Sequence, residues 1–186
     1  MRAAVLAVHR SPRHSFSKPT VEEIELVEGI GVRGDAHAGP TVKHRSRVRA
    51  DPHQPNLRQV HLIHAELLDD LRAVGHDVQP GELGENITTR DIRLLELPVG
   101  TRLTIGEAVI TVSGLRNPCR QINGFQPGLL RHVLRQGPVG SLERLTGVMG
   151  TVSRGGTVRP TTTSRWSSRR SRTTCRRRSE HLSTRV

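Results

Sequence analysis

The chain has 186 residues and a formal charge of +12, from 29 Lys and Arg against 17 Asp and Glu. That length suits one domain with a core of its own, while two cysteines exclude a disulfide framework and no apolar run is long enough to cross a bilayer. Aromatic residues make up 2% of the sequence, which argues against the base-stacking platforms of single-stranded nucleic-acid readers. We therefore expect a soluble, cytoplasmic protein with no membrane partner.

The positive charge is concentrated at the C-terminal end. The segment 161–186 contains eight arginines and one glutamate, so it carries +7 and leaves +5 for the residues before it. It has almost no aliphatic residues, and such a segment cannot bury enough apolar surface to order itself. We expect one domain over residues 1–160 and a disordered, Arg-rich tail over 161–186. Any binding to nucleic acid would be non-specific and would come through this tail.

Short apolar runs rich in β-branched residues follow one another through the first 160 residues, separated by Gly, Pro and Asn. This pattern is typical of a mainly β protein and favours a β-barrel with a few peripheral α-helices. Strands are expected at 3–9, 21–27, 59–63, 85–88, 102–105, 108–113 and 147–153. Apolar faces with helical spacing predict helices at 64–74 and 126–136, the second with Pro127 near its start.

A polar stretch over 34–57 is rich in Arg, His, Pro and Gly, and we expect it to be a long loop that contributes nothing to a core. Long loops of this kind are usually functional or disordered. Two interpretations stay open, a solvated loop and a flap that binds an anion. For the flap, guanidinium groups suited to phosphate or carboxylate are the candidate donors, namely Arg45, Arg47, Arg49 and Arg58.

Two glycine-rich segments carry acidic and imidazole groups. In GVRGDAHAG, Asp35 and His37 are two residues apart, so an extended backbone would point both side chains into one site. The alternative is a turn in which Asp35 caps local backbone amides. The segment PGELGENITT holds a second set, for which functional and structural interpretations are balanced: Glu82, Gly84, Glu85 and Asn86.

Two further histidines, His61 and His64, are three residues apart at a strand end. Side chains at this spacing on a strand point to opposite faces. This argues against a pair that chelates zinc.

Cys119, in GLRNPCRQI, is the only cysteine outside the C-terminal segment. A thiol acts as nucleophile, sulfur carrier or soft-metal ligand in its ionised form, which neighbouring cations such as Arg116 and Arg120 favour. A lone cysteine can instead be an inert residue in a core. Pro118 and the polar neighbours favour a loop at a strand end, where chemistry is possible.

The sequence resembles the MOSC family, whose domain also forms the C-terminus of molybdenum cofactor sulfurases. Four segments carry the resemblance in the family's order, and standalone bacterial members look closest: GVRGDAHAG, LRQVHLIHAELLDDL, the stretch from PGELGENITT through GLRNPCRQI, and GVMGTVSRGGTVRP. The resemblance covers about residues 1–160 and implies a MOSC-type β-barrel. The sequence departs from the family in two places. Ala38 stands where a second glycine is common, and the Arg-rich segment replaces the closing strand expected after GGTVRP.

The resemblance also implies a site for the molybdenum cofactor, a molybdopterin. Cys119 would either ligate the molybdenum, for which thiolate is an apt ligand, or carry sulfur as a persulfide. The cofactor-binding residues implied by the matching segments, together with basic groups that suit the cofactor's phosphate, are Arg116, Asn117, Arg58, Asp35, His37, Glu82, Gly84, Glu85 and Asn86.

The activity implied by the resemblance is reduction of N-hydroxylated compounds, such as hydroxylamine-type base analogues. Electrons would come from a separate partner reductase, because the chain lacks the cysteines for an iron–sulfur cluster and any flavin fingerprint. The alternative is a non-catalytic carrier that delivers sulfur or cofactor to a target enzyme. Pyridoxal phosphate is not expected, because Lys18 and Lys43 are the only lysines and neither lies in an apolar pocket motif.

Overall fold

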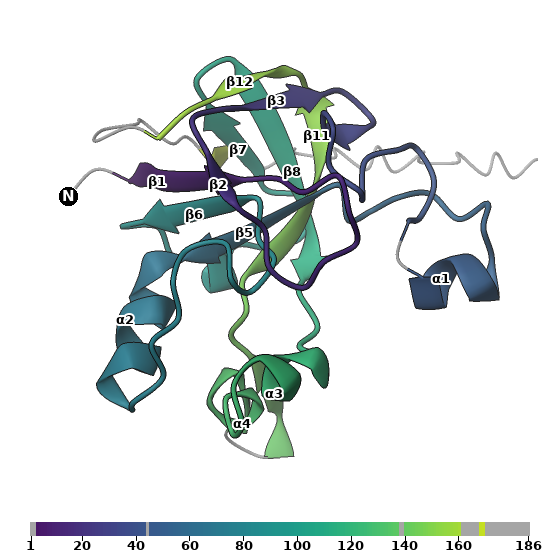
Figure 1. Ribbon diagram of the computed structural model, residues 1–186. Coiled ribbons are helices and arrows are strands. Elements are labelled where there is room, and N and C mark those ends of the chain that lie inside the picture. The colour runs from purple at the N-terminus through teal and green to yellow at the C-terminus, as the bar shows by residue number, and fades with distance from the viewer. Residues whose placement is uncertain (1–2, 44, 138–139, 161–167, 170–186) are drawn as a thin grey trace, which may run out of the picture.

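The computed structural model describes residues 3–43, 45–137, 140–160 and 168–169, without the side chains of 45–47 and 168–169. The protein is mainly β with a few short helices, as the sequence predicted (Figure 1). None of the helices in these residues has the length and apolar character that a bilayer span requires.

One large sheet organises the fold. Its eight strands are, in spatial order, β13 (Ser168–Arg169), β7 (Arg102–Ile105), β8 (Ala108–Leu115), β11 (Val148–Arg154), β5 (Val60–His64), β6 (Ile87–Arg90), β1 (Ala4–His9) and β2 (Thr20–Val21). Only β5 and β6 pair in parallel, and the remaining neighbours are antiparallel. The outermost strands, β13 and β2, do not pair with each other in the described part of the chain, so this sheet is open and the closed barrel stays a prediction.

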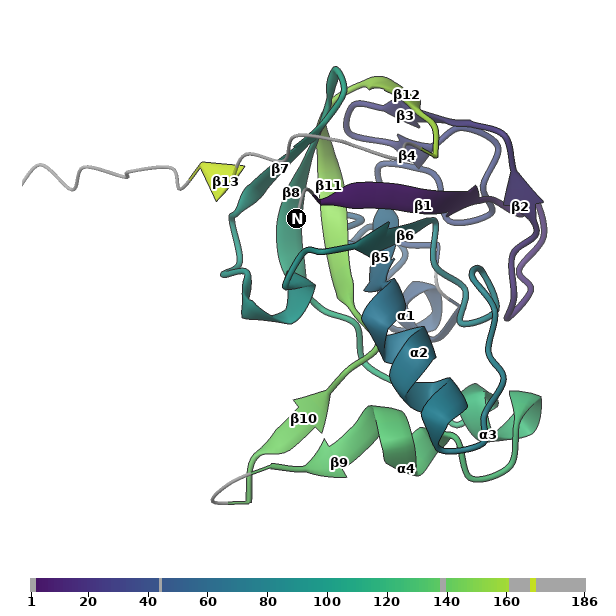
Figure 2. The same cartoon turned by 90° about the vertical axis from the view of Figure 1, so that its left-hand side faces the viewer.

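Smaller elements complete the fold around this sheet. A three-stranded sheet joins β12 (Gly156–Val158), β3 (Ile24–Val27) and β4 (Gly31–Val32), and a two-stranded one joins β9 (Leu134–Gln136) and β10 (Leu142–Arg144). The helices are α1 (Arg45–Ala50), α2 (Ala65–Ala73), the 3₁₀ turn η1 (Leu94–Glu96), α3 (Gln121–Phe125) and α4 (Leu130–Val133). Helices α3 and α4 and the β9–β10 pair lie together below the large sheet in both views (Figures 1 and 2).

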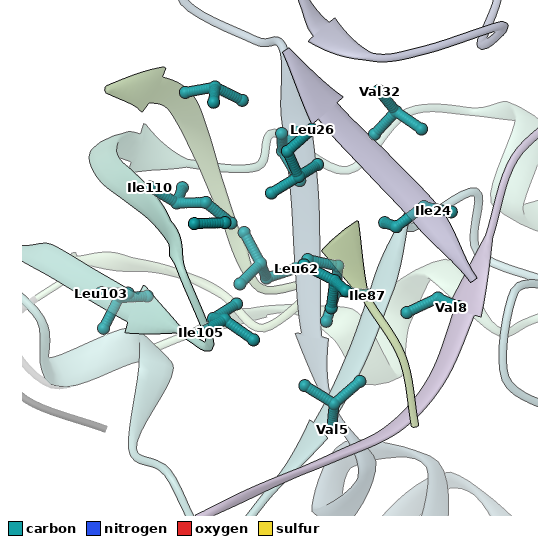
Figure 3. Packing of buried hydrophobic residues seen from close by; sticks show 14 of the residues in the cluster. Val5, Val8, Ile24, Leu26, Val32, Leu62, Ile87, Leu103, Ile105 and Ile110 are labelled. Atoms are coloured by element: carbon teal, nitrogen blue, oxygen red, sulfur yellow. The ribbon is translucent and has the colours of Figure 1, made fainter. Parts of the chain in front are cut away.

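Two apolar clusters hold these layers together. In the first, Leu62 and Ile110 of the large sheet pack with Leu26 of the small sheet (Figure 3). In the second, α2 packs through Leu71 and its neighbours against Ile63. Residues 62 and 63 point to opposite faces of β5, as period-2 alternation requires. Each fully buried aliphatic side chain contributes about 1.5–3 kcal/mol, so β5 is held from both sides and can position a site at its end.

Several predicted elements differ from the structure. The helix expected at 126–136 is wrong, because Gly128 has a φ of +82°, only α4 forms after it, and 134–136 is strand β9. The strand expected at 21–27 is divided between β2 and β3. The loop expected at 34–57 contains helix α1. The disorder expected for 161–186 concerns residues outside the described ones, except that β13 pairs with Leu103 and Arg102 of β7.

Candidate functional site

A pocket with a cavity of about 140 Å³ lies where the loop after β8 meets the segments around residues 16 and 84. Seven of the residues expected at the site line it: His37, Arg58, Gly84, Asn86, Arg116, Asn117 and Cys119. The structure therefore brings together groups that are up to 82 positions apart in the sequence, from His37 to Cys119.

Cys119 lies in the loop between β8 and α3. The loop is fixed at its start, where the Arg116 amide donates to the Gly147 carbonyl (3.0 Å), and at its end, where the Ile122 amide donates to the Cys119 carbonyl (3.1 Å). Pro118 is buried, whereas the cysteine is half-buried and its Sγ lies 3.5 Å from Gln121 Oε1. The thiol therefore faces the pocket and is not sealed in the core.

Arg116 lies directly beside this sulfur. Burial lowers the pKa of Arg116, while the neighbouring Cys119 sulfur acts in the opposite direction. The Nη1 atom is buried and has no hydrogen-bond partner among the described residues. A buried donor without a partner costs about 1–3 kcal/mol, so the pocket contains a cationic donor ready for an acceptor on a ligand.

Asp35 lies behind the pocket and joins three of its lining residues. Its carboxylate accepts hydrogen bonds from Lys18 Nζ (2.8 Å), Asn86 Nδ2 (3.0 Å) and His37 Nδ1 (3.2 Å). Burial alone would raise the pKa of Asp35, but the hydrogen bond from His37 and the Lys18 ammonium hold it well below its usual range. Asp35 therefore supports the site and does not line it.

His37 takes its orientation from this carboxylate. Both its backbone amide and Nδ1 reach Asp35 Oδ1, at 3.0 and 3.2 Å, which is the turn considered from the sequence. With Nδ1 donating to the carboxylate, Nε2 is the ring nitrogen left for a ligand. The structure therefore has the capped turn, in which His37 lines the pocket and Asp35 lies behind it.

Lys18 and His61 are lining residues that the sequence analysis did not place at the site. Lys18 is buried, and burial lowers its pKa although Asp35 opposes this. His61 donates from Nε2 to the Thr146 carbonyl (2.7 Å), and burial with the Arg116 charge lowers the pKa of His61 to about 3. His64 lines a different cavity, so the expected opposite orientation of the two histidines is confirmed.

Glu82 and Glu85 do not line the pocket, contrary to the expected ligand set. Glu82 accepts from the Gln79 amide (2.7 Å) and closes a local turn. Glu85 is fully buried, and its Oε1 accepts from the Gly81 amide (2.6 Å). Gly84 lines the pocket, but at a φ of +83° and with Phe16 O only 2.6 Å from where a Cβ would lie, only glycine fits there.

The structure describes the side chains of two of the four arginines expected in the flap. Arg58 lines the pocket, whereas Arg49 is exposed on α1 and is not among the lining residues. The side chains of Arg45 and Arg47 lie outside the described part of the structure. Lys43 also lines the pocket. A second cavity of about 280 Å³ adjoins the first and shares three of its residues: Val42, Arg58 and Met149.

The pocket thus has two parts, named here by their exposure. The back wall consists of Lys18, His61 and Asn86 with Asp35 behind them, all buried, and the mouth consists of Lys43, Arg58 and Asn117. Cys119 and Arg116 lie between the two. In the described part of the chain, no group of three or more His, Cys, Asp or Glu side chains could hold a metal ion.

The sequence profile of the MOSC domain matches residues 41–163. The chain belongs to the MOSC domain family. This MOSC protein is similar in fold to standalone bacterial proteins. YuaD from Bacillus subtilis is 23% identical with a TM-score of 0.69, over 86% of this chain and 92% of that one. No curated protein matches the chain.

Two structures of YiiM are also similar to this MOSC protein. The protein from Geobacillus stearothermophilus is 14% identical with a TM-score of 0.57, over 89% of this chain and 74% of that one. The protein from Escherichia coli is 23% identical with a TM-score of 0.55, over 86% of this chain and 66% of that one. At these identities the likeness shows a shared fold.

Proposed function

We propose that this MOSC protein binds the molybdenum cofactor in the pocket, with the Cys119 thiolate as a ligand of the molybdenum. We further propose that it reduces N-hydroxylated compounds with electrons from a partner reductase. One observation carries the proposal, namely a half-buried, pocket-facing thiol beside a guanidinium whose buried Nη1 has no partner among the described residues. A MOSC-type barrel is the fold that this proposal expects.

The residues present suit such a cofactor. Thiolate is a good ligand for a soft, redox-active metal. The cofactor also carries a phosphate, and phosphate is bound best by charged donors with several N–H groups. The pocket supplies these donors at Arg58, Lys43 and Arg116, with Asn117 beside them. Once bound, the cofactor would supply the two-electron redox centre.

The protein's own residues would orient and isolate the bound group. Arg116 stabilises negative charge next to the sulfur and gains a partner for Nη1 when a ligand acceptor arrives. His37 presents Nε2 in an orientation fixed by Asp35. His61 stays neutral at physiological pH, because burial lowers its pKa to about 3.

A carrier role is the second candidate, and the geometry of Cys119 favours it as well. The thiol is half-buried in a loop, so a sulfur atom held on it as a persulfide would stay accessible to an acceptor protein. The two roles differ in turnover. An enzyme consumes electrons for every substrate molecule, whereas a carrier hands its cargo to an acceptor protein and does not turn over the substrate.

Turnover of a reduced dye by cofactor-loaded protein tests the proposal. We expect the wild-type chain to oxidise the dye when a hydroxylamine-type substrate is added, and Cys119→Ser to show none. Cys175→Ser is the matched control, because Cys175 is the only other cysteine and lies in the segment 161–186. Loaded wild-type protein that contains molybdenum and shows no turnover contradicts the reductase and supports the carrier.

A further inference from the structure

A row of hydrogen-bonded side chains crosses the edge of the large sheet, from β2 through β1 to β6. Thr20 is exposed, and its Oγ1 lies 3.1 Å from His9 Nδ1. The other nitrogen of this ring, Nε2, lies 3.1 Å from Thr88 Oγ1. The Thr88 hydroxyl donates to Glu85 Oε1 at 3.0 Å. His9, Thr88 and Glu85 are fully buried, so the row connects solvent with the interior.

The hydroxyl proton of Thr88 fixes which group donates in each hydrogen bond of this row. The Thr88 hydroxyl has a single hydrogen and gives it to Glu85, so its oxygen must accept from His9 Nε2. A neutral imidazole with hydrogen on Nε2 accepts at Nδ1, and therefore the Thr20 hydroxyl donates there. All three donors point inward, which is the arrangement that lets a proton move from the surface to Glu85.

The inner end of the row lies behind the pocket wall, because Glu85 itself does not line the pocket. Glu85 is flanked by Gly84 and Asn86, both of which line it, and the Lys18 ammonium on the back wall acts on its charge. Glu85 Oε2 has no hydrogen-bond partner among the described residues. An ionised carboxylate is strongly disfavoured at such a place, and burial raises the pKa of Glu85 despite the nearby Lys18. Burial therefore favours the protonated form of Glu85, with the proton on Oε2, because Oε1 accepts from the Gly81 amide and the Thr88 hydroxyl.

We propose that Thr20, His9, Thr88 and Glu85 form a proton relay from solvent to Glu85, a buried proton store behind the back wall of the pocket. Hydrogen bonds that only hold these strands together would not require an imidazole ring or an exposed outer residue. This row has both, in His9 and Thr20. The charged groups near its members are Lys18, which acts on both His9 and Glu85, and Arg116, which acts on Glu85.

The use of the relay in catalysis rests on the proposed function. Reduction of R–NH–OH takes up two electrons from the partner reductase and two protons, breaks the N–O bond, and yields R–NH₂ and water. The relay supplies one of these protons. Glu85 releases its proton toward the back wall, where the Lys18 ammonium acts on its charge. Thr88 then passes its hydroxyl proton to Glu85, and His9 Nε2 restores the hydroxyl. The Thr20 hydroxyl then gives a proton to Nδ1 and takes one from solvent.

Infrared spectroscopy of the full chain without cofactor tests the relay itself. We expect the C=O stretching band of a protonated carboxyl group at neutral pH, and its loss in Glu85→Gln. On mixing with D₂O the band should shift rapidly in the wild type. In Thr88→Val the shift should be slower by roughly a hundredfold, the lower range for a positioned acid–base group. Thr88→Ser keeps the hydroxyl and should restore the wild-type rate.

Two results overturn the relay. One is a band that persists in Glu85→Gln, or is missing from the wild type, because Glu85 then holds no proton. The other is exchange in Thr88→Val at the wild-type rate. If Thr88→Val does not fold, His9→Gln serves instead, because its amide keeps a donor for Thr88 but does not exchange protons between two nitrogens. Slow exchange in these variants with no turnover by loaded wild-type protein leaves the relay standing and contradicts the reductase.

Discussion

On the back wall of the pocket buried polar groups pair with one another, whereas at the mouth Lys43 and Asn117 are exposed to solvent. The Asp35 carboxylate alone binds Lys18, His37 and Asn86. Pairing of this kind fixes side chains before any ligand arrives, because each would otherwise be buried without a partner. The back wall therefore fixes the shape of the pocket, whereas the groups at the mouth can attract and bind an anion.

Removal of the Asp35 carboxylate should cause the largest loss in the free energy of unfolding. In Asp35→Ala the Lys18 ammonium stays buried without its partner, and breaking a buried ion pair in this way costs about 3–5 kcal/mol. We expect that loss in the free energy of unfolding by urea denaturation. Glu82→Ala is the control, because Glu82 makes only a local turn. A loss for Asp35→Ala as small as that of the control would show that the pairing does not hold the wall.

The neutral His61 should make stability depend on pH. Its pKa is 6.5 in the unfolded chain and about 3 in the folded one, so the unfolded state binds more protons between these values. The free energy of unfolding should therefore fall as the pH drops below 6.5. In His61→Gln, which keeps a donor for Thr146, the slope between about pH 4 and 6 should decrease by about 1.4 kcal/mol per pH unit. An unchanged slope contradicts the buried neutral ring.

Substitution of Arg116 should weaken cofactor binding without lowering the stability of the protein. Its buried Nη1 has no partner among the described residues, so Arg116→Met removes an uncompensated donor and keeps a long apolar stem. We expect the free energy of unfolding of cofactor-free protein to stay the same or rise. Cofactor retention should fall by about tenfold or more, because a hydrogen bond from a charged group is lost. A clear loss of stability with retention unchanged would assign Arg116 a structural role.

The smallest effects are expected at the mouth. Arg58→Ala should weaken retention of the phosphate-bearing cofactor by about tenfold. Arg49→Ala should leave it unchanged, because Arg49 does not line the pocket. Arg49→Ala should change the free energy of unfolding by less than about 0.5 kcal/mol, as is usual for an exposed position. Equal retention by the two variants would remove Arg58 from the site.

The parts of the site carried by local sequence were predictable. Asp35 and His37 are joined by a turn two residues long, and Pro118 with its polar neighbours marked the loop of Cys119. Lys18 was missed because its burial comes from a tertiary contact with Asp35, 17 positions later, which no local pattern records. The sequence left two interpretations of the acidic segment open, and in the structure Glu82 and Glu85 bind nearby backbone amides and do not line the pocket.

The same distinction applies to the fold. Strands β7 and β8 match the expected ranges closely, because their alternating burial is visible in the sequence. The apolar spacing at 126–136 suggested one helix, but Gly128 adopts a left-handed conformation and the chain then turns into β9. The apolar residues Leu129 and Val133 still pack in the second cluster. Burial was therefore predicted correctly and the backbone conformation was not.

Molybdenum and phosphorus content per chain is the most direct test of the central claim, that Cys119 holds the cofactor in this pocket. The protein is expressed in a host that makes the cofactor, and the wild type is compared with Cys119→Ser and Cys175→Ser. We expect both elements in the wild type and in Cys175→Ser, and loss of molybdenum from a folded Cys119→Ser. Molybdenum content unchanged in Cys119→Ser would contradict the account.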